Sequence, residues 1–480
     1  MRFLLKTDCL GFRSDICDVV RLFYPDAEIT LEDPYDFIIE HICIYENGTQ
    51  TDTWTLSEDG VGVLRRNTRV SRGVEGDALT VKRLRKRAVK LALYELLKAH
   101  TGRRLPWGSL TGIRPTAVAY ELMEHGGQIE DLTRIFDVSE EKTEIVRRIL
   151  RLQRGLVEYE DDALDVYIGI PFCRTRCSYC SFAAVEIGRY AACASPYMDA
   201  LEKEMRFTAT LAAELRKRIR AVYIGGGTPT ALDEPLFDRL MKLTAELFVS
   251  DGVEFTVEAG RPDTITKSKL TSMRAAGVGR VSINPQTMND ATLARVGRAH
   301  TAEDICRCFV AARELFPVIN MDLIAGLPGE NAGDFAATLK AVGELAPDNL
   351  TVHTLALKKG SALRQREEAY PPADEVERML ALAADFTVEN GYEPYYLYRQ
   401  KYMTGNFENV GYTRPGAVCR YNIDIMEETT SIAALGAGAI SKRVYPTGGR
   451  IERSPDLRDV RLYIDGVDEM NERKRRLFTD

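Results

Sequence analysis

The sequence predicts an α/β fold in which a partial (β/α)6 barrel of the TIM type follows an N-terminal α+β domain and precedes a C-terminal extension. In the middle of the chain, six short apolar segments alternate with helical ones, which is typical of repeated βα units and a parallel sheet. The segments before and after this region lack the alternation. Because six units are fewer than the eight of a closed barrel, we expect the barrel to be open on one side.

The chain is expected to divide into four parts. These are an α+β domain over residues 1–105, a helical connector over 106–160, the barrel over 161–370 and the extension over 371–480. In the first two parts, alternating or periodic apolar residues predict three strands and four helices. The strands are 2–7, 37–45 and 51–56, and the helices are 16–23, 80–100, 117–125 and 140–155.

The barrel region supplies the strands and helices of the six units. The predicted strands are 166–170, 221–224, 254–257, 280–283, 320–324 and 350–355. The predicted helices between them are 197–218, 235–248, 267–275, 302–315 and 335–345. Since barrel enzymes carry their chemistry at the carboxyl ends of the strands, we expect the functional residues to follow these segments.

Composition excludes several classes of function. The chain has 64 Lys and Arg against 71 Asp and Glu, a formal net charge of −7, so no basic surface indicates nucleic-acid binding. No apolar run reaches the roughly 20 residues of a membrane span, and charges interrupt the N-terminus too early for a signal peptide. We therefore expect a cytoplasmic protein. The basic segments 82–87 and 473–476 are interpreted as solvent-facing helix surfaces.

Three of the ten cysteines, Cys173, Cys177 and Cys180, follow the first predicted barrel strand with the spacing CxxxCxxC. Three thiolates on a four-iron cluster leave one iron open to a ligand, whereas clusters that only carry electrons take four cysteines. A zinc site would need a fourth ligand, often from a second cysteine pair, and the spacing does not supply it. A purely structural role does not suit a loop that also carries Arg174 and Arg176. The pattern therefore predicts a 4Fe–4S cluster, whose charge these two arginines would help to offset.

Other segments carry a family resemblance: VYIGIPFC, AVYIGGGTPT, FTVEAGRPDTI, RVSINPQTMND, VGRAHT and NMDLIAGLPGE. Together with the cysteines, they resemble the radical S-adenosylmethionine (SAM) coproporphyrinogen III dehydrogenase family, which includes HemN, HemW and HemZ. The resemblance covers residues 107–463. Gly169, where HemN usually has histidine, and the segments YLYRQKYMTGNFENVGY and YNIDIMEET make the sequence most similar to HemZ. The family implies a radical SAM barrel, a 4Fe–4S cluster and one or two molecules of SAM.

Residue types at successive strand ends agree with SAM binding. The glycines 225–227 have no Cβ and allow close approach of the backbone to a ligand. Glu258 suits the ammonium of SAM, Gln286 and Asp322 suit ribose hydroxyls, and Arg298 suits a carboxylate. By resemblance, the complete SAM-binding set is Tyr167, Tyr179, Gly226, Gly227, Thr228, Glu258, Gln286, Arg298, Asp322, Ala356 and Ile440.

The resemblance implies that a 5′-deoxyadenosyl radical drives the oxidative decarboxylation of coproporphyrinogen III to protoporphyrinogen IX. A one-electron reductant such as flavodoxin or ferredoxin would be the partner. This substrate has four carboxylates and needs cations and hydroxyl donors. The segment YYLYRQK is expected to supply them while covering the open side of the barrel. The predicted substrate contacts are Tyr396, Tyr398, Arg399 and Lys401, and no catalytic residue is predicted.

Two alternatives stay open. HemN has a further cysteine two positions after the third cluster cysteine, and here Phe182 occupies that position. HemW has a similar aromatic residue there and is a haem-binding chaperone, so a haem-trafficking protein is the first alternative. The second is a HemN-like methyltransferase that uses two SAM molecules. The sequence does not indicate the oligomeric state.

Overall fold

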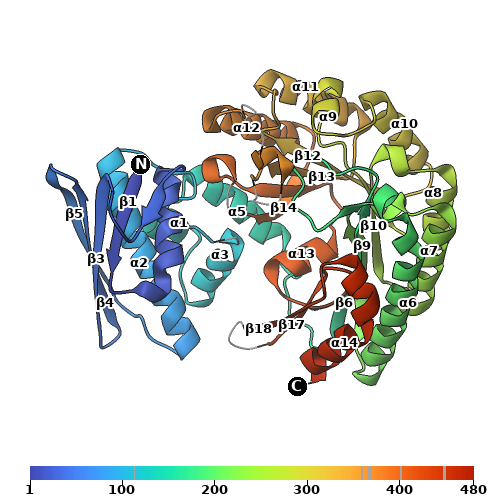
Figure 1. Ribbon diagram of the computed structural model, residues 1–480, viewed down its shortest axis with the longest axis horizontal. Helices are drawn as coiled ribbons and strands as arrows, with labels where there is room; N and C mark the ends of the chain where they lie inside the picture. The colour runs from blue at the N-terminus through green and yellow to red at the C-terminus, as the bar shows by residue number, and fades with distance from the viewer. Residues whose placement is uncertain (113, 358–360, 366–369, 401–402, 447–449, 480) are drawn as a thin grey trace. The chain divides into compact units, whose positions relative to one another are not determined.

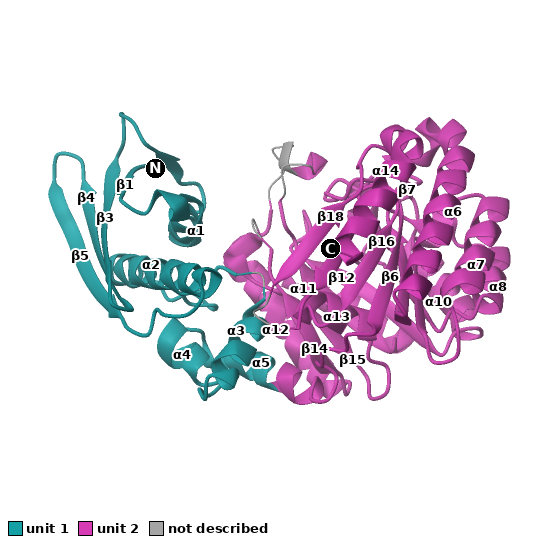
Figure 2. Ribbon diagram, turned by 90° about the horizontal axis from the view of Figure 1, so that it is seen from below, with its two compact units in different colours: residues 1–147 teal, residues 148–480 magenta. Residues whose placement is uncertain are grey.

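The computed structural model describes residues 1–480 except 113, 358–360, 366–369, 401–402, 447–449 and 480. The chain forms two compact units, Met1–Arg147 and Arg148–Asp480 (Figure 2). Among the described residues, none of the helices combines the length and the apolar character that crossing a membrane would need.

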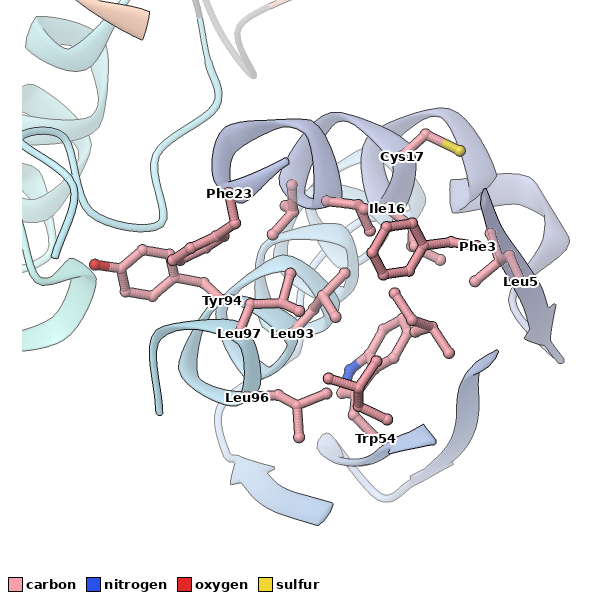
Figure 3. Packing of buried hydrophobic residues seen from close by; sticks show 14 of the residues in the cluster. Phe3, Leu5, Ile16, Cys17, Phe23, Trp54, Leu93, Tyr94, Leu96 and Leu97 are labelled. Atoms are coloured by element: carbon pink, nitrogen blue, oxygen red, sulfur yellow. The ribbon is translucent and has the colours of Figure 1, made fainter. Parts of the chain in front are cut away.

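The first unit is a five-stranded sheet with two helices packed on it. Strand β1 pairs in parallel with β2 and β3, and β3, β4 and β5 are antiparallel neighbours, in the order β2-β1-β3-β4-β5. Side chains from β1, β4, α1 and α2 interlock in one apolar core, with Trp54 fully buried at its centre (Figure 3). The elements are β1 (Arg2–Thr7), α1 (Arg13–Phe23), β2 (Glu28–Thr30), β3 (Phe37–Glu46), β4 (Thr49–Glu58), β5 (Gly62–Ser71) and α2 (Ala78–Thr101).

Three helices follow: α3 (Pro115–Glu124), α4 (Asp131–Phe136) and α5 (Glu140–Leu152). The predicted strands and helices of this region are present. Strands β2 and β5 and helix α4 were not predicted. Strand β5 lies at an edge of the sheet and carries charged residues, so its sequence lacks a strong apolar alternation.

The second unit is built on one sheet of eleven strands in the order β14-β15-β13-β12-β11-β10-β9-β6-β16-β17-β18. Its six central strands are the predicted ones, and each pairs in parallel with its neighbour. The alternation of strands and helices is therefore confirmed, and the linear strand order is that of a sheet that does not close. The six are β6 (Ala163–Ile170), β9 (Arg218–Gly226), β10 (Glu254–Gly260), β11 (Arg280–Ile283), β12 (Val318–Ala325) and β13 (Asn349–Thr354).

Helices cover the outer face of these strands, where fully buried side chains such as Val222, Ile224, Val257 and Ile319 alternate with the polar residues of the inner face (Figure 1). The connecting helices are α6 (Ala191–Glu214), α7 (Glu234–Phe248), α8 (Lys267–Ala275), α9 (Asp290–Arg295), α10 (Ala302–Arg313), α11 (Ala332–Leu345) and α12 (Ala373–Glu389). Short 3-10 turns lie at Leu10–Phe12, Ile187–Arg189, Pro229–Ala231, Pro262–Thr264, Ala362–Gln365 and Thr404–Asn406.

The predicted helix 197–218 was wrong at both ends. Helix α6 begins earlier and stops at Glu214, because Arg216 takes a left-handed conformation with a φ of 51°. Arg218 then donates its backbone N–H to the Asp162 carbonyl at 2.7 Å and starts β9. Helical periodicity alone could not show that these charged residues already belong to the turn and the next strand.

The C-terminal extension widens the sheet at both edges. β15 pairs with β13 and β14 pairs with β15, while β16 pairs in parallel with β6. The described residues of the YYLYRQK segment belong to the edge strand β14, and Tyr395 and Tyr396 pack in one cluster with Ala221, Tyr421 and Ile432. The expectation that this segment covers the open side stays a prediction. The exposed backbone groups of β6 and β13 explain why added strands bind there. The elements are β14 (Glu393–Tyr398), β15 (Asn409–Thr413), α13 (Arg420–Glu427), β16 (Ser431–Leu435), β17 (Ile440–Val444), β18 (Ile451–Pro455) and α14 (Val460–Thr479).

Helix α14 packs against α6 through a buried ion pair. Lys474 is 1% exposed and its Nζ lies 2.5 Å from Oε1 of the fully buried Glu204. The interpretation of 473–476 as a solvent-facing surface was therefore wrong at Lys474. A buried carboxylate needs a cation, and this lysine supplies it.

Candidate active site

The cysteine loop, residues 173–180, begins in a two-stranded sheet of β7 (Phe172–Cys173) and β8 (Val185–Glu186). The glycine run after β9 holds the entry to this loop. Gly227 N donates to the Ile170 carbonyl and Thr228 N to the Phe172 carbonyl, each at 2.7 Å. A Cβ at Gly227 would lie 2.6 Å from the Phe172 oxygen, so only glycine fits. The glycines therefore allow a close approach between their own backbone and the backbone that leads into the cysteine loop.

The three thiols of this loop are half-buried, and they lie close enough for the charge of one to affect the pKa of another. Burial, followed by the neighbouring Cys180 and Cys177, raises the pKa of Cys173 to about 11, although a hydrogen bond from Thr228 opposes the rise. Thr228 Oγ1 lies 3.5 Å from Cys173 Sγ. Burial also raises the pKa of Cys180. Thiolates at this site therefore need a cation, and a bound metal would provide it.

Arg261 is a functional candidate that the sequence did not single out. It is 3% exposed, and its Nη1 lies 4.0 Å from Cys177 Sγ and donates to the Thr175 carbonyl at 3.0 Å. A two-point ion pair with Asp263 fixes its guanidinium. Arg174, in contrast, has 57% of its side chain exposed. The arginine directly after the third barrel strand is thus a buried cation beside the cysteines. Its position in the RPD sequence after that strand was the signal that could have found it.

Asp263 also joins a histidine to this network. Burial alone would raise the pKa of Asp263, but hydrogen bonds with His300 and Arg261 outweigh burial and hold the pKa below its usual value. His300 Nδ1 lies 3.4 Å from Asp263 Oδ1. The carboxylate is therefore the shared anchor of two groups that surround the cysteine loop.

Arg298 clamps the loop to the segment after β11. Its Nη1 donates to the Tyr179 hydroxyl at 2.9 Å, its Nη2 to the Asn284 carbonyl at 2.5 Å, and its Nε to His300 Nε2 at 3.4 Å. The side chain is 5% exposed, so these partners satisfy donors that burial would otherwise leave without water. The structure thus brings the predicted residues Tyr179 and Arg298 together. The proposed contact of Arg298 with a carboxylate of SAM stays a prediction, because each terminal nitrogen keeps a second N–H.

Glu258 lies on β10 beside the glycine run. The Tyr223 hydroxyl donates to its Oε1 at 2.7 Å, and a Cβ at Gly225 would lie 2.9 Å from its carboxyl carbon. Burial raises the pKa of Glu258 to about 7, and the nearby Asp322 adds to the rise while the Tyr223 hydrogen bond opposes it. A cationic ligand would restore the charged form, which is what an ammonium partner provides.

Four side chains on β12, β13 and β14 continue the inner face. Asn320 donates to Asp322 Oδ1 at 2.8 Å, and Asp322 Oδ2 lies 3.7 Å from His353 Nε2. The Tyr398 hydroxyl is 3.3 Å from His353 Nδ1. His353 has 25% of its side chain exposed and was not predicted as a site residue. Its place near the end of the sixth barrel strand was the signal that could have found it.

Gln286 has a buried acceptor that could bind a ligand. Its backbone has a φ of 69° and bonds to Asp322 and Ile324, so the residue is locked against β12. Its side-chain Oε1 is buried, and among the described residues no donor reaches it. Leaving such an oxygen unsatisfied costs about 1–3 kcal/mol. A hydroxyl donor of a bound ligand, such as a ribose, would satisfy it.

The remaining predicted SAM contacts are more dispersed. Tyr167 stacks near Tyr223 and Tyr421, with ring centroids 6.3 and 6.4 Å away. Ala356 forms a single bridge with Met403. Ile440 starts β17, two strands away from β6, and is 47% exposed. The roles of these positions stay predictions.

The predicted substrate residues separate into two groups. Tyr396 is 5% exposed and its hydroxyl lies 3.2 Å from Thr351 Oγ1. Arg399 is 2% exposed and donates to the Asn406 carbonyl at 3.0 Å, while burial lowers its pKa to about 10. Arg399 is therefore held inside the hairpin of β14 and β15, whereas Tyr396 packs toward β13 and the aromatic cluster that includes Tyr421. Tyr398 contacts His353 of the inner face, and Lys401 lies outside the described residues.

Comparison with known proteins agrees with this arrangement. Residues 167–342 match the model of the Radical SAM superfamily. The chain is 36% identical over 475 residues to the oxygen-independent coproporphyrinogen-III oxidase-like protein HemZ of Bacillus subtilis, covering 95% of this chain and 93% of the relative. The chain belongs to the HemN/HemW/HemZ-like family of radical SAM proteins.

Other members share a smaller part. The heme chaperone HemW of Bacillus subtilis is 34% identical over 44% of this chain and 56% of its own length. The structure of coproporphyrinogen III oxidase (HemN) from Escherichia coli matches with a TM-score of 0.54 and 27% identity, over 67% of this chain and 73% of that one. Membership in the radical SAM family implies a 4Fe–4S cluster and SAM. The grouped thiols and the buried Gln286 oxygen fit these two groups.

Proposed function

We propose that this protein catalyses the oxygen-independent oxidative decarboxylation of coproporphyrinogen III to protoporphyrinogen IX. The observation that carries the proposal is the row of polar groups at the carboxyl ends of neighbouring parallel strands. The cysteine loop follows β6, Glu258 lies on β10, Gln286 follows β11, Asp322 lies on β12 and His353 on β13. The kinship with HemZ over nearly the whole chain supports the choice of substrate.

The chain's own residues would hold the two cofactors. Cys173, Cys177 and Cys180 supply three thiolates and leave one iron of a 4Fe–4S cluster for SAM. Glu258 accepts from the amino group of SAM, and Gln286 with Asp322 accepts from ribose hydroxyls. When bound, cluster and SAM supply the 5′-deoxyadenosyl radical that removes a hydrogen atom from the substrate. A reductant of the flavodoxin or ferredoxin class provides the electron.

The substrate change balances without oxygen. A propionate loses a hydrogen atom from its β-carbon, then one electron and CO₂, and a vinyl group remains. The electron passes to a one-electron acceptor, and two propionates react in turn. In this proposal His353, held between Asp322 and Tyr398 and partly exposed, donates to a substrate carboxylate. The remaining predicted contact, Lys401, keeps its proposed role as a cation for a second propionate.

One observation favours a second function, haem trafficking. Phe182, two residues after Cys180, is 68% exposed although it is large and apolar. An exposed aromatic ring beside a cluster loop is a contact that an apolar macrocycle would use. The heme chaperone HemW is among the relatives.

Anaerobic assay separates these functions. The purified protein is reconstituted with iron and sulfide, reduced, and incubated with SAM and coproporphyrinogen III, and products are identified by mass spectrometry. The proposal expects loss of two CO₂ and formation of 5′-deoxyadenosine. A gain of CH₂ would indicate methylation. Tight haem binding without decarboxylation would overturn the proposal in favour of trafficking. Phe182→Ala should then weaken haem binding, whereas it should leave decarboxylation at the wild-type rate if the protein is the dehydrogenase.

A further inference from the structure

The first unit contains a second group of metal-ligand side chains, far from the cysteine loop in sequence. Cys9 follows β1, His41 and Cys43 lie on β3, and Asp52 faces Cys43 across the β3–β4 pair. His41, Cys43 and Asp52 lie on the same face of the sheet as the side chains of the apolar core, at the edge of that core. A polar cluster that includes two cysteines and a fully buried histidine needs a reason at that position.

The ligand atoms of this cluster converge. Those of Asp8, Cys9 and His41 all lie within 4.8 Å of one another, and so do those of His41, Cys43 and Asp52. The thiols of Cys9 and Cys43 are within hydrogen-bonding reach of each other. The Asp8 carboxylate is tied to the same strand, because its Oδ2 accepts from the Cys43 backbone N–H at 2.9 Å. Its Oδ1 lies 3.9 Å from His41 Nδ1.

The histidine ring is oriented as a metal ligand would be. His41 Nε2 lies 3.0 Å from Asp52 Oδ1, and both side chains are fully buried. Gln50 donates to both oxygens of Asp52, and the ring stacks on Trp54 with centroids 3.9 Å apart. Histidine ligands of metals commonly donate their second N–H to a carboxylate in this way. The arrangement favours a proton on Nε2 and turns Nδ1 toward Asp8 and the Thr7 hydroxyl.

We propose that Cys9 Sγ, Cys43 Sγ, His41 Nδ1 and the Asp8 carboxylate bind one zinc ion in tetrahedral geometry. Zinc bonds of about 2.0–2.3 Å need such ligand atoms within about 4 Å of one another. The atoms of Asp8, Cys9 and His41 already lie within 4.8 Å of one another, and Cys43 has to move its thiol toward them. Two thiol protons leave on binding, and the Thr7 hydroxyl gives up its contact with Nδ1. The ion ties the chain after β1 to β3.

Charge balance supports this composition. Two thiolates and the Asp8 carboxylate exceed the charge of Zn²⁺ by one, and the Arg85 guanidinium, with its Nη2 3.8 Å from Cys43 Sγ, offsets that charge. The Asp52 carboxylate adds one more negative charge, which its hydrogen bonds with His41 and Gln50 stabilise. The same arginine donates to Gln50 and stacks over Tyr45, so it is fixed beside the site. The site does not depend on the proposed enzymatic function, because its ligands all belong to the first unit.

Metal analysis of the full-length protein, purified without oxygen, tests the proposal. We expect one zinc per chain in addition to the cluster iron. Cys9→Ser and Cys43→Ser should lose the zinc and keep the iron, while Cys17→Ala, a matched control from the same unit, should keep both. Wild-type protein that holds no zinc after incubation with Zn²⁺ and dialysis would overturn the proposal, as would variants that retain it.

Two further measurements test the zinc site if the Cys9 or Cys43 variant fails to fold. Co²⁺ added to the full chain with Cys173, Cys177 and Cys180 replaced by Ala should give thiolate charge-transfer and tetrahedral d–d absorption. Asp52→Asn removes no ligand and should lower zinc affinity about ten- to a hundredfold. An octahedral cobalt spectrum, or a Cys9–Cys43 disulfide found by mass spectrometry in the oxygen-free protein, would contradict the zinc site.

Discussion

Two groups of cysteines in this protein, one in each unit, come together in opposite ways. In the second unit, Cys173, Cys177 and Cys180 lie on one loop after a parallel strand. Their spacing in the sequence alone therefore indicates a shared cluster. In the first unit, Cys9 follows β1 and Cys43 lies on β3, and the pairing of β1 with β3 brings them together. Contiguous ligands can be recognised from a sequence, whereas ligands collected by a sheet need its register.

The largest expected effect separates these two regions. Cys180→Ser should lower reductive SAM cleavage to background, because the cluster loses one of its three thiolates. Cys43→Ser should leave SAM cleavage at the wild-type rate, since it lies in the other unit. The readout is 5′-deoxyadenosine by chromatography under dithionite. Equal loss in both variants would mean that the two regions are not independent.

A smaller effect is expected at Glu258, which lies on the inner face without touching the cysteines. Glu258→Gln keeps the shape of the side chain and removes its charge, so SAM affinity should fall about ten- to a hundredfold, as expected for losing a charge-assisted hydrogen bond. The measurement is SAM binding by calorimetry with the iron content checked. Glu254→Gln, on the same strand but at its other end, is the control, and a matching loss there would remove the special role of Glu258.

The stability of the ligand-free protein should depend on Glu258 through pH. Its pKa is raised from 4.5 to about 7 in the folded protein, so the folded state binds the proton more tightly than the unfolded state. The stability that this protonation contributes is present at low pH and is lost as pH rises through about 7. Glu258→Gln should therefore gain thermal stability over wild type at pH 8 and much less at pH 5. A constant difference between the two pH values would contradict the burial of this carboxyl group.

The smallest expected effect concerns Arg399, which the sequence suggested for substrate and the structure places inside a hairpin. Arg399→Gln should lower the free energy of unfolding by about 1–3 kcal/mol, because a buried charged hydrogen bond to Asn406 is lost. The KM for coproporphyrinogen III should not change. Urea unfolding and steady-state kinetics measure the two quantities, and a raised KM at unchanged stability would return Arg399 to the substrate site.

Much of the second unit could be predicted because the local pattern of apolar residues identifies each central strand and each helix between these strands. Helix α8 and strand β11 match the predicted bounds residue for residue. The edge strands β14–β18 were not predicted, since their place depends on which edges β6 and β13 leave free. Local patterns thus identified the central strands, and tertiary pairing decided the rest.

The same distinction holds for the candidate site. Glu258, Gln286 and Asp322 could be selected because each lies in the later part of a barrel strand or just after one. Arg261 and His353 could not be ranked, because their importance comes from neighbours: the Cys177 sulfur for the first and Asp322 with Tyr398 for the second. The role of a single charged residue can be recognised only when the folded structure shows which groups lie beside it.

The central claim is that the row of polar groups on the inner face directs hydrogen-atom removal from a propionate. Coproporphyrinogen III carrying deuterium at the propionate β-carbons tests it most directly, with the reconstituted protein, SAM and a reductant under anaerobic conditions. The account predicts deuterium in 5′-deoxyadenosine together with divinyl product. Unlabelled 5′-deoxyadenosine without protoporphyrinogen IX would contradict it.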